Sequence, residues 1–480
     1  MGLARFSALV LAAACETSTK SPSADSSPSS PPPVVANGHD WLRFNVDEGR
    51  SGVSTAPTGI TADSLASMQR QQVALDGTVD SSPIYLHDVT VKGAQHDVFF
   101  VTTTYGKTIA VDANDGSILW EFTPPNYSQW AGSYRITTAT PVADPDRSAV
   151  YAASPDGKIQ KLAVADGHVL WSTAITLLPT REKIASALNF SRGRVIAVTG
   201  GYIGDAPPYQ GHVALLDAAT GSVARIWNSL CSDRSGLIDP SSCSSSGSAI
   251  WGRAGAVVDS ATGNILLATG NARWDGQTNW GDAVLALDAG ASRLVANYTP
   301  SNTETLNSTD ADIGSTSPVF LDATHVLQGG KDGRLRILDL QALGGASSHR
   351  GGELQSVATP SGSALFTAPA VWRQADATWI FAADNGGTAA WTYRNGSLTK
   401  AWSASTAGTS PVVAGGMLFV YDPGGTLRVF EPATGKPLGQ LSAGSGHWNS
   451  PIVVDRRIAL PQGNANSHAT SGTFNIWRLP

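Results

Sequence analysis

The stretch Ile109-Ala110-Val111-Asp112-Ala113-Asn114-Asp115-Gly116, followed by Trp120, contains the pattern that decides the fold. An apolar run ends in an acidic turn that contains glycine, and a tryptophan stands in the next run. The apolar run and the acidic turn with glycine return at Val213 to Gly221 and at Val429 to Gly435. Runs of β-branched and aromatic residues between Asp- and Gly-containing turns are typical of antiparallel strands. The pattern therefore predicts an all-β protein built from repeated units.

Working outward, the chain repeats a unit of roughly 40 to 70 residues, a period at which four-stranded propeller blades occur. Each unit opens with a small or hydroxyl residue before proline or an apolar residue. The openings fall near Ser82, Thr140, Ala187, Arg253, Ser317, Ala368, Ser410 and Ser450. Because each four-stranded sheet needs partners on both faces, a closed ring is the expected arrangement. The sequence predicts an eight-bladed β-propeller, with seven blades as the alternative if one long unit is irregular.

The last unit ends with Phe474-Asn475-Ile476-Trp477 at the C-terminus and has no fourth strand after it. The N-terminal stretch Gln72-Val73-Ala74-Leu75 is the remaining strand-like segment. We expect this N-terminal strand to complete the eighth blade, which leaves no free sheet edge. The tryptophans of the last runs, Trp120, Trp171 and Trp402, are expected to wedge between neighbouring blades.

The N-terminus has the features of an export signal. Arg5 precedes a short apolar core from Phe6 to Ala14, and Cys15 follows at once. This order resembles a bacterial lipobox, in which the cysteine is lipidated; cleavage of an ordinary signal peptide near Ala14 is the alternative. We expect a signal peptide at 1–14, a Ser/Pro-rich linker at 15–39 and one propeller domain at 40–480. The protein is then exported, as a periplasmic or membrane-anchored lipoprotein of a bacterium.

Cysteine use and charge narrow the possible partners. Cys231 and Cys243 lie in one loop and are expected to form a disulfide in an oxidising compartment. No Cys-x-x-Cys-His occurs, so covalent haem attachment is not expected. The net charge of −6 and the absence of Lys/Arg runs argue against a nucleic-acid partner. No apolar stretch reaches ~18 residues, so no transmembrane span is expected.

The Asp-Ala-x-Thr/Asp-Gly-x-x-x-Trp units resemble the repeats of quinoprotein (pyrroloquinoline quinone, PQQ) dehydrogenases. The outer-membrane assembly lipoprotein BamB carries similar repeats. The stretch from Trp251 to Lys331, with Leu267-Ala268-Thr269-Gly270-Asn271 inside it, is the most specific part. Its order is similar to the segment that forms the quinone site in quinoprotein alcohol dehydrogenases. The resemblance implies a propeller fold and PQQ as a cofactor.

By the same resemblance, individual residues acquire expected roles. Trp251 would stack under the planar cofactor, and Asn271 would match the asparagine that ligates calcium beside it. Lys331 would contact the reactive quinone carbonyl, and Arg135 would hold a cofactor carboxylate. A carboxylate must take the alcohol proton as hydride leaves, and Asp310 and Asp312 are the candidates for this catalytic role. The structural alternatives are packing between blades for Trp251 and ordinary turn roles for the polar residues.

Departures from the family pattern argue against parts of this site. The vicinal cysteine pair above the quinone is absent, and the calcium-binding glutamate falls on Tyr202, which cannot replace a bidentate carboxylate. Counting back from Pro318, Asp312 matches the second family acid, whereas the base position falls on Thr309 with Asp310 one residue away. Asp205 is the alternative acid that could reach the site, but nothing in the sequence shows that it does, so these departures argue against bound Ca²⁺.

Two functions remain open from the sequence. One is a PQQ-dependent dehydrogenase, an oxidoreductase acting on a small alcohol or sugar. The other is a non-catalytic propeller that acts as a binding or assembly scaffold for an envelope protein. Fold alone does not choose between them, because function is set by the site.

Overall fold

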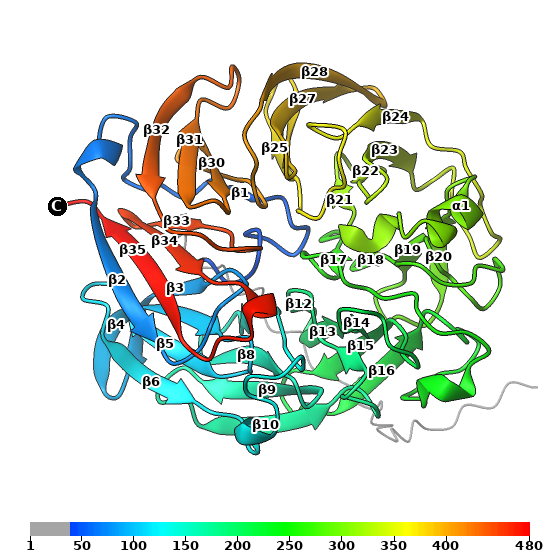
Figure 1. Cartoon of the computed structure of the whole chain (residues 1–480), viewed down its shortest axis with the longest axis horizontal. Helices are drawn as coiled ribbons and strands as arrows, with labels where there is room; N and C mark the ends of the chain where they lie inside the picture. The colour runs from blue at the N-terminus through cyan, green and yellow to red at the C-terminus, as the bar shows by residue number, and fades with distance from the viewer. Residues whose placement is uncertain (1–38) are drawn as a thin grey trace, which may run out of the picture. The chain divides into compact units, whose positions relative to one another are not determined.

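A computed structural model describes residues 39–480, which form a ring of eight blades (Figure 1). Each blade is a four-stranded antiparallel sheet, so the eight-bladed prediction is confirmed and the seven-bladed alternative is wrong. The predicted signal peptide, Cys15 and all but the end of the linker lie outside the described residues. Within residues 39–480 no helix is long and apolar enough to cross a membrane.

The strands occupy four positions in the blades, numbered here from the inner edge outward. The inner strands are β3 (Ile84–Val91), β7 (Val142–Ala143), β12 (Asn189–Ser191), β17 (Val257–Val258), β21 (Val319–Phe320), β25 (Ala370–Arg373), β29 (Val412–Ala414) and β33 (Ile452–Val454). The second strands are β4 (Ala94–Thr102), β8 (Ala149–Ser154), β13 (Arg194–Val198), β18 (Ile265–Ala268), β22 (His325–Gln328), β26 (Thr378–Ala383), β30 (Met417–Asp422) and β34 (Arg457–Gln462). The third strands are β5 (Thr108–Asp112), β9 (Lys158–Ala163), β15 (His212–Asp217), β19 (Val284–Leu287), β23 (Arg334–Asp339), β27 (Thr388–Arg394), β31 (Thr426–Phe430) and β35 (Gly472–Arg478). The outer strands are β6 (Ile118–Phe122), β10 (Val169–Ala174), β16 (Val223–Asn228), β20 (Leu294–Tyr298), β24 (Gln355–Ala358), β28 (Ser397–Ala404), β32 (Pro437–Ser442) and β2 (Gln69–Leu75).

Short elements lie between the blades. They are β1 (Val53–Ser54), the pair β11 (Glu182–Lys183) and β14 (Gly200–Gly201), the α-helix α1 (Thr303–Ser308), and the 3₁₀ turns η1 (Leu65–Ser67), η2 (Tyr127–Gln129), η3 (Pro240–Ser242), η4 (Ile313–Ser315) and η5 (Ala465–Ser467). Cys231 and Cys243 form the predicted disulfide in the loop after β16.

The hydrophobic core lies between the blades, and side chains from both faces of a strand pack into it. In β4 the side chains of Phe99 and Val101 pack toward blade 8, whereas those of Val98 and Phe100 pack toward blade 2. Successive side chains of a strand point to opposite faces, so a strand buried on both faces needs a continuous apolar run. This requirement explains continuous apolar runs such as Val98 to Val101 in β4 and Val213 to Leu216 in β15. Burial of both faces by the neighbouring blades stabilises the ring.

The repeated tryptophans join consecutive blades through a second contact. The indole N–H of Trp120 donates to the carbonyl of Val164 in the next blade at 2.9 Å. Gly167 lies directly under that indole with φ +76°, and a Cβ there would lie 2.5 Å from the ring. Trp171 and Trp402 make the equivalent bonds to their next blades. The Gly in the acidic turn and the Trp in the outer strand are therefore two halves of one contact, which explains why they repeat together.

The N-terminal strand closes the ring as predicted. Strand β2 pairs antiparallel with β35, with Val73 opposite Phe474, and Figure 1 shows the two strands side by side. At this closing interface Gln71 of β2 lies over Gly116 where three other blades have the tryptophan, and Arg478 Nε donates to the carbonyl of Ala113 at 2.7 Å. Blade 8 is thus made from both ends of the described chain, so neither end leaves an unpaired outer edge.

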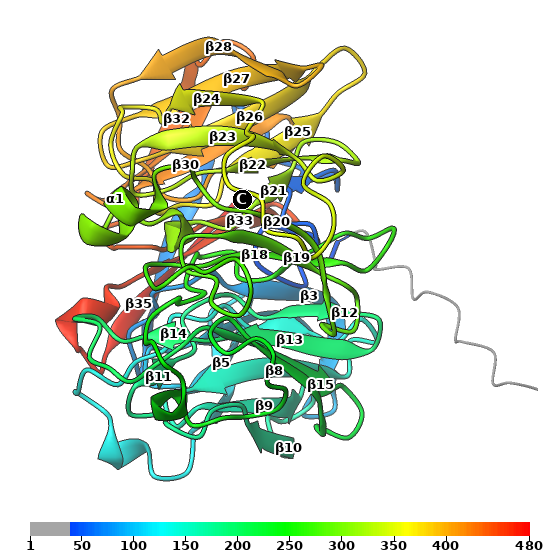
Figure 2. The same cartoon turned by 90° about the vertical axis from the view of Figure 1, so that its right-hand side faces the viewer.

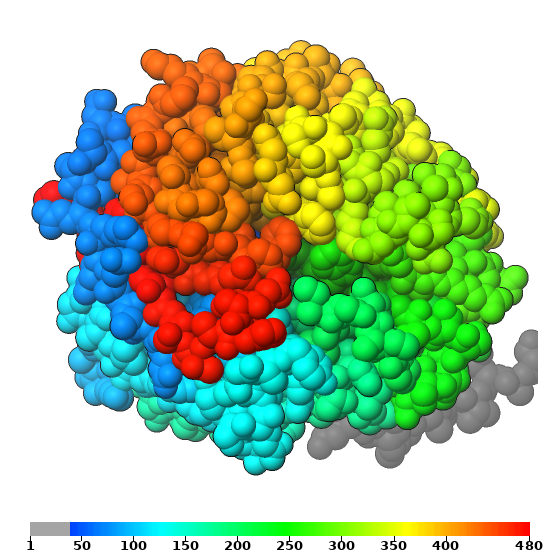
Figure 3. All heavy atoms as spheres, in the orientation of Figure 1, coloured from blue at the N-terminus to red at the C-terminus, as the bar shows by residue number. Residues whose placement is uncertain are grey.

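The segment from Trp41 to Ser54 crosses the ring on the face opposite α1 (Figures 1 and 2). Its backbone bonds inner segments of several blades, and β1 extends the sheet of blade 7 by pairing with β29. The buried Arg50 side chain donates to the carbonyls of Phe44 and Leu188 at 2.7 and 2.8 Å. Figure 3 shows the other face, which is hollowed near the centre of the ring. The segment therefore covers one end of the ring and leaves the hollow on the other.

Candidate functional site

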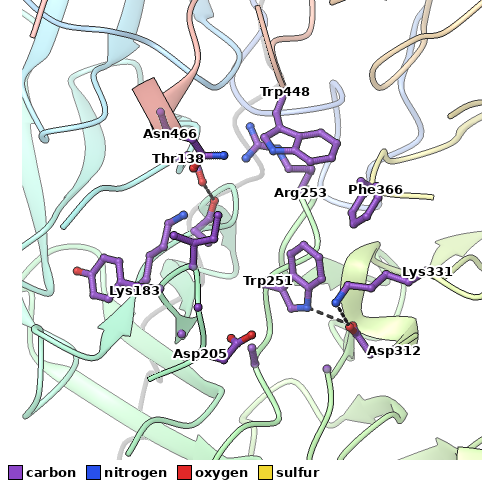
Figure 4. Close-up of a pocket in the computed structure, with 18 of the residues that line it drawn as sticks. Thr138, Lys183, Asp205, Trp251, Arg253, Asp312, Lys331, Phe366, Trp448 and Asn466 are labelled. Carbon is purple, nitrogen blue, oxygen red and sulfur yellow. Dashed lines mark hydrogen bonds and ion pairs between the residues drawn. The ribbon is translucent and has the colours of Figure 1, made fainter. Parts of the chain in front are cut away.

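A cavity of about 480 Å³ lies on the face that carries α1 (Figure 4). Its walls come from the segments that lead into the inner strands and from the loops between the second and third strands of blades 3, 4, 5 and 8. Among the residues that line it are Asp80, Thr138, Lys183, Tyr202, Asp205, Trp251, Arg253, Asn271, Asp310, Asp312, Lys331, Phe366, His447, Trp448 and Asn466. The lining combines the rings of two tyrosines, two tryptophans and one phenylalanine with charged groups of both signs.

Trp251, Asp312 and Lys331 form one connected group on the cavity wall (Figure 4). The Trp251 indole N–H donates to Asp312 Oδ1 at 3.2 Å, and Lys331 Nζ lies 2.6 Å from Asp312 Oδ2. Lys331 Nζ also lies 5.1 Å from the centre of the Trp251 ring. Gly252 permits this arrangement, because a Cβ there would lie 2.5 Å from the backbone of Thr316. Asp312 therefore holds both the aromatic ring and the ammonium group in place.

Asp310 lies at the rim of the same group, directly after α1. Its φ of +53° is in the left-handed region, at the position after a helix where Gly or Asn is usual. This conformation directs Oδ1 to Lys331 Nζ at 2.6 Å and to the Asn271 amide nitrogen at 2.7 Å. Among residues 39–480 no group bonds Oδ2 of this exposed carboxylate. Asp310 is thus fixed by one oxygen and offers the other to a ligand.

Burial and mutual repulsion set the protonation of the acids. Burial raises the pKa of Asp312, although Lys331 opposes the rise. Burial and the charge of Asp312 raise the pKa of the fully buried Asp282 to about 8, so Asp282 is neutral at pH 7. Burial lowers the pKa of Lys331, but Asp312 and Asp310 outweigh this effect and raise it above its usual value. Lys331 is therefore a stable cation that neutralises part of an acidic cluster.

The opposite wall is aromatic and is anchored by Asp80. The rings of Phe366 and Trp448 lie 5.3 Å apart, and Phe366 reaches to 6.0 Å from Trp251. The fully buried Asp80 carboxylate accepts from His447 Nδ1 at 2.7 Å and from the Trp448 backbone N–H at 2.8 Å. Burial alone would raise the pKa of Asp80, but His447, Arg253 and the Ala465 backbone N–H together outweigh it, and the net shift is downward. The cavity thus presents an aromatic arc between two charged regions.

Comparisons with known proteins agree with this architecture. A family model for PQQ-type repeats, described as outer membrane protein assembly factor BamB, matches residues 71–229 and 128–302. The chain is a β-propeller of PQQ-like repeats. No curated protein matches the chain.

Solved structures resemble this PQQ-like propeller at low sequence identity. A quinohemoprotein alcohol dehydrogenase from Pseudomonas putida HK5 superposes with a TM-score of 0.68 at 15% identity, covering 92% of this chain and 80% of the other. A europium-containing methanol dehydrogenase gives 0.67 at 15% identity, with 92% and 98% covered. BamB from Moraxella catarrhalis gives 0.52 at 15% identity, with 85% and 98% covered. At these identities the likeness establishes the fold and leaves the chemistry to the site.

The structure brings together most of the residues expected for the site of a PQQ-like propeller. Trp251, Asn271, Lys331 and both acids line the one cavity. Arg135 is not among the lining residues. Its guanidinium donates to the Pro155 carbonyl at 3.1 Å and lies 5.5 Å from the Trp130 ring.

The position expected for the calcium-binding glutamate carries no ligand in this chain. Tyr202 donates its hydroxyl to the Pro179 carbonyl at 2.9 Å, and Asp205 accepts from the Tyr209 hydroxyl at 3.0 Å. Lys331 already occupies the space between Asp310 and Asp312. No group of three His, Cys, Asp or Glu side chains within residues 39–480 could hold a metal ion. These residues do not fit Ca²⁺.

Sequence reasoning missed the other half of the cavity. Asp80, Thr138, Phe366 and Trp448 each stand three residues before the proline that opens a blade. This position precedes the inner strand, and in these four blades it faces the cavity at the centre of the ring. The spacing to the opening proline was the signal that could have located these side chains.

Proposed function

We propose that the cavity binds PQQ and that the protein is an exported dehydrogenase of small alcohols or sugars. The observation that supports this proposal most is the convergence of Trp251, Lys331 and Asp310 on one cavity. A planar anionic quinone requires an aromatic face and cations, and the lining contains Trp251, Phe366, Trp448, Lys183, Arg253 and Lys331. When bound, PQQ supplies a two-electron acceptor.

Side chains of the cavity would position the planar group and accept the substrate proton. Trp251, held by Asp312, offers the ring on which a planar group can lie. Asp310 has a free carboxylate oxygen at the rim and can accept the proton of a substrate hydroxyl. Lys331 keeps that carboxylate in position and stabilises its charge. Asn271 bonds the same oxygen from the other side, which leaves Oδ2 as the proton acceptor.

The test is binding and turnover with the purified protein. We expect PQQ to raise the melting temperature and to support reduction of an artificial electron acceptor by an alcohol or sugar, without added Ca²⁺. Asp310→Asn should retain PQQ binding and lose turnover at least 100-fold, as expected for loss of a general base. Absence of any thermal shift at tens of micromolar PQQ would refute the proposal.

A non-catalytic scaffold is the second candidate. The lack of a metal-ligand group around Asp310 and Asp312 within residues 39–480 favours it, because Lewis-acid activation of the quinone would then be missing. In this function the cavity is a remnant of an ancestral quinone site, and the surface of the ring binds an envelope protein. The two candidates share export and an anchor at Cys15, which globomycin-sensitive processing of the full chain would test.

A further inference from the structure

Two cations lie at the end of the cavity away from the acidic cluster. In Figure 4, Lys183 and Lys331 lie on opposite sides of Trp251, and Arg253 lies beside Trp448. Lys183 belongs to β11, and Arg253 follows Trp251 by two residues on the way into β17. These two side chains therefore form a positive region that is distinct from the Lys331 group.

Neither cation has its own carboxylate partner. The Lys183 ammonium has no hydrogen-bond or ion-pair partner within residues 39–480. Arg253 donates through Nη2 to the backbone carbonyl of Asp80 at 2.6 Å and lies 5.8 Å from the Trp448 ring. Asp80 cannot serve both, because its carboxylate already accepts from His447, Trp448 and Ala465. A partly buried ammonium and a buried guanidinium without a carboxylate partner are unfavourable until an anion joins them.

The pKa shifts of Lys183 and Arg253 also indicate that their positive charge is only partly neutralised. Burial, with Arg253 as the next contribution, lowers the pKa of Lys183 to about 8. Burial lowers the pKa of Arg253, and Asp80 offsets this only in part. The other charged or titratable groups that line this part of the cavity are His447, Asp205 and Tyr202. Asp205 is engaged by Tyr209, and His447 by Asp80, so neither is free to neutralise Lys183.

We propose that Lys183 and Arg253 form an anion subsite that binds the carboxylate of a ring-shaped ligand lying against Trp448. The carboxylate can belong to the quinone or to an acidic substrate, and the chemistry of recognition is the same for both. This subsite goes beyond the proposed function, because it would bind a carboxylate whether that group belongs to the quinone or to an acidic substrate.

The test uses calorimetric titration of the full protein with three probes: PQQ, pyridine-2,6-dicarboxylate and the neutral pyridine-2,6-dicarboxamide. We expect at least one of the two anions to bind, and Lys183→Met to weaken it at least tenfold. Lys183→Arg should restore most of the affinity, and the diamide should not bind. Lys436→Met, which removes an exposed lysine, is the matched control and should change nothing.

Proton uptake separates a direct contact from a structural effect. An anion beside Lys183 raises the pKa of that ammonium, so binding at pH 8.5 should take up protons and binding at pH 6.5 should not. Titrations in two buffers of different ionisation enthalpy measure this uptake, and Lys183→Met should abolish it. Met retains the apolar stem of this half-buried side chain, so this variant is expected to fold.

The possible outcomes distinguish the two proposals. Lys183-dependent binding of the dicarboxylate without any PQQ binding refutes the proposed function and supports the subsite. PQQ binding that Lys183→Met leaves unchanged, with no binding of the dicarboxylate, refutes the subsite and supports the proposed function. Loss of PQQ binding alone in Lys183→Met assigns the subsite to a quinone carboxylate. Failure of both anions to bind at millimolar concentration refutes both.

Discussion

Lys331 and Asp312 form an ion pair of 2.6 Å at the cavity wall, with only 2% of the Asp312 side chain exposed. The same Asp312 carboxylate accepts from the Trp251 indole at 3.2 Å. One buried acid therefore couples the aromatic platform to the cation beside it. The arrangement makes each of the three side chains sensitive to loss of the others.

Lys331→Met should destabilise the protein by about 3–5 kcal/mol, because it leaves the Asp312 charge buried without its partner. Urea unfolding at pH 7 measures this change in the free energy of unfolding. The double variant Lys331→Met with Asp312→Asn removes both charges and should recover most of the loss. An equal loss in the single and double variants would contradict the coupling.

Asp282→Asn should change the pH dependence of stability. With its pKa at about 8, folded Asp282 keeps a proton that the unfolded chain has lost above pH 4. Stability of the parent protein should therefore fall as pH rises from 4 to 8, by about 1.4 kcal/mol per pH unit from this group.

The variant lacks this group, so it should be increasingly more stable than the parent between pH 5 and pH 8. Urea unfolding at pH 5, 6.5 and 8 checks the slope. Parallel pH profiles for parent and variant would mean that the pKa of Asp282 is not raised.

Gly167→Ala should weaken the contact between blades 1 and 2. The new Cβ would lie 2.5 Å from the Trp120 ring, in addition to the strain of a positive φ. Gly193→Ala is the matched control, because its φ is also positive at +73° but nothing lies within 4 Å of the added Cβ.

We expect Gly167→Ala to cost about 1–3 kcal/mol more than Gly193→Ala, the range found for overpacking of close contacts. Thermal unfolding of both variants gives the difference. Equal losses would show that the backbone conformation alone requires glycine, and that the tryptophan does not.

Arg50→Met should weaken the segment that covers the opposite face of the ring. Burial and the neighbouring Arg43 lower the pKa of Arg50 to about 9, so it remains charged at pH 7 and donates to two backbone carbonyls. Hydrogen bonds from a charged donor contribute about 1.5–3 kcal/mol each.

Loss of Arg50 should therefore expose the segment from Trp41 to Ser54 to limited proteolysis before the blades unfold. Mass spectrometry of the early fragments identifies the cleavage sites. Cleavage that starts within the blades would show that the segment is held mainly by its backbone bonds.

The sequence by itself determined the ring. The apolar runs, the acidic Gly turns and the outer-strand tryptophans predicted eight blades and the N-terminal closing strand, because each is a local requirement of strand, turn or packing geometry. It also predicted that Trp251, Asn271, Lys331, Asp310 and Asp312 belong together.

Only the tertiary structure decided how the cavity is completed. Trp448, Phe366 and Asp80 come from blades far apart in the sequence, and only closure of the ring brings their inner ends together. The left-handed backbone at Asp310 directs its carboxylate to Lys331. Arg135, by contrast, was expected in the site but is not part of the cavity lining. Its side chain instead bonds the Pro155 carbonyl and lies against the Trp130 ring. Local patterns specify strands and turns, whereas the chemistry of the centre depends on which side chains the closed ring places opposite one another.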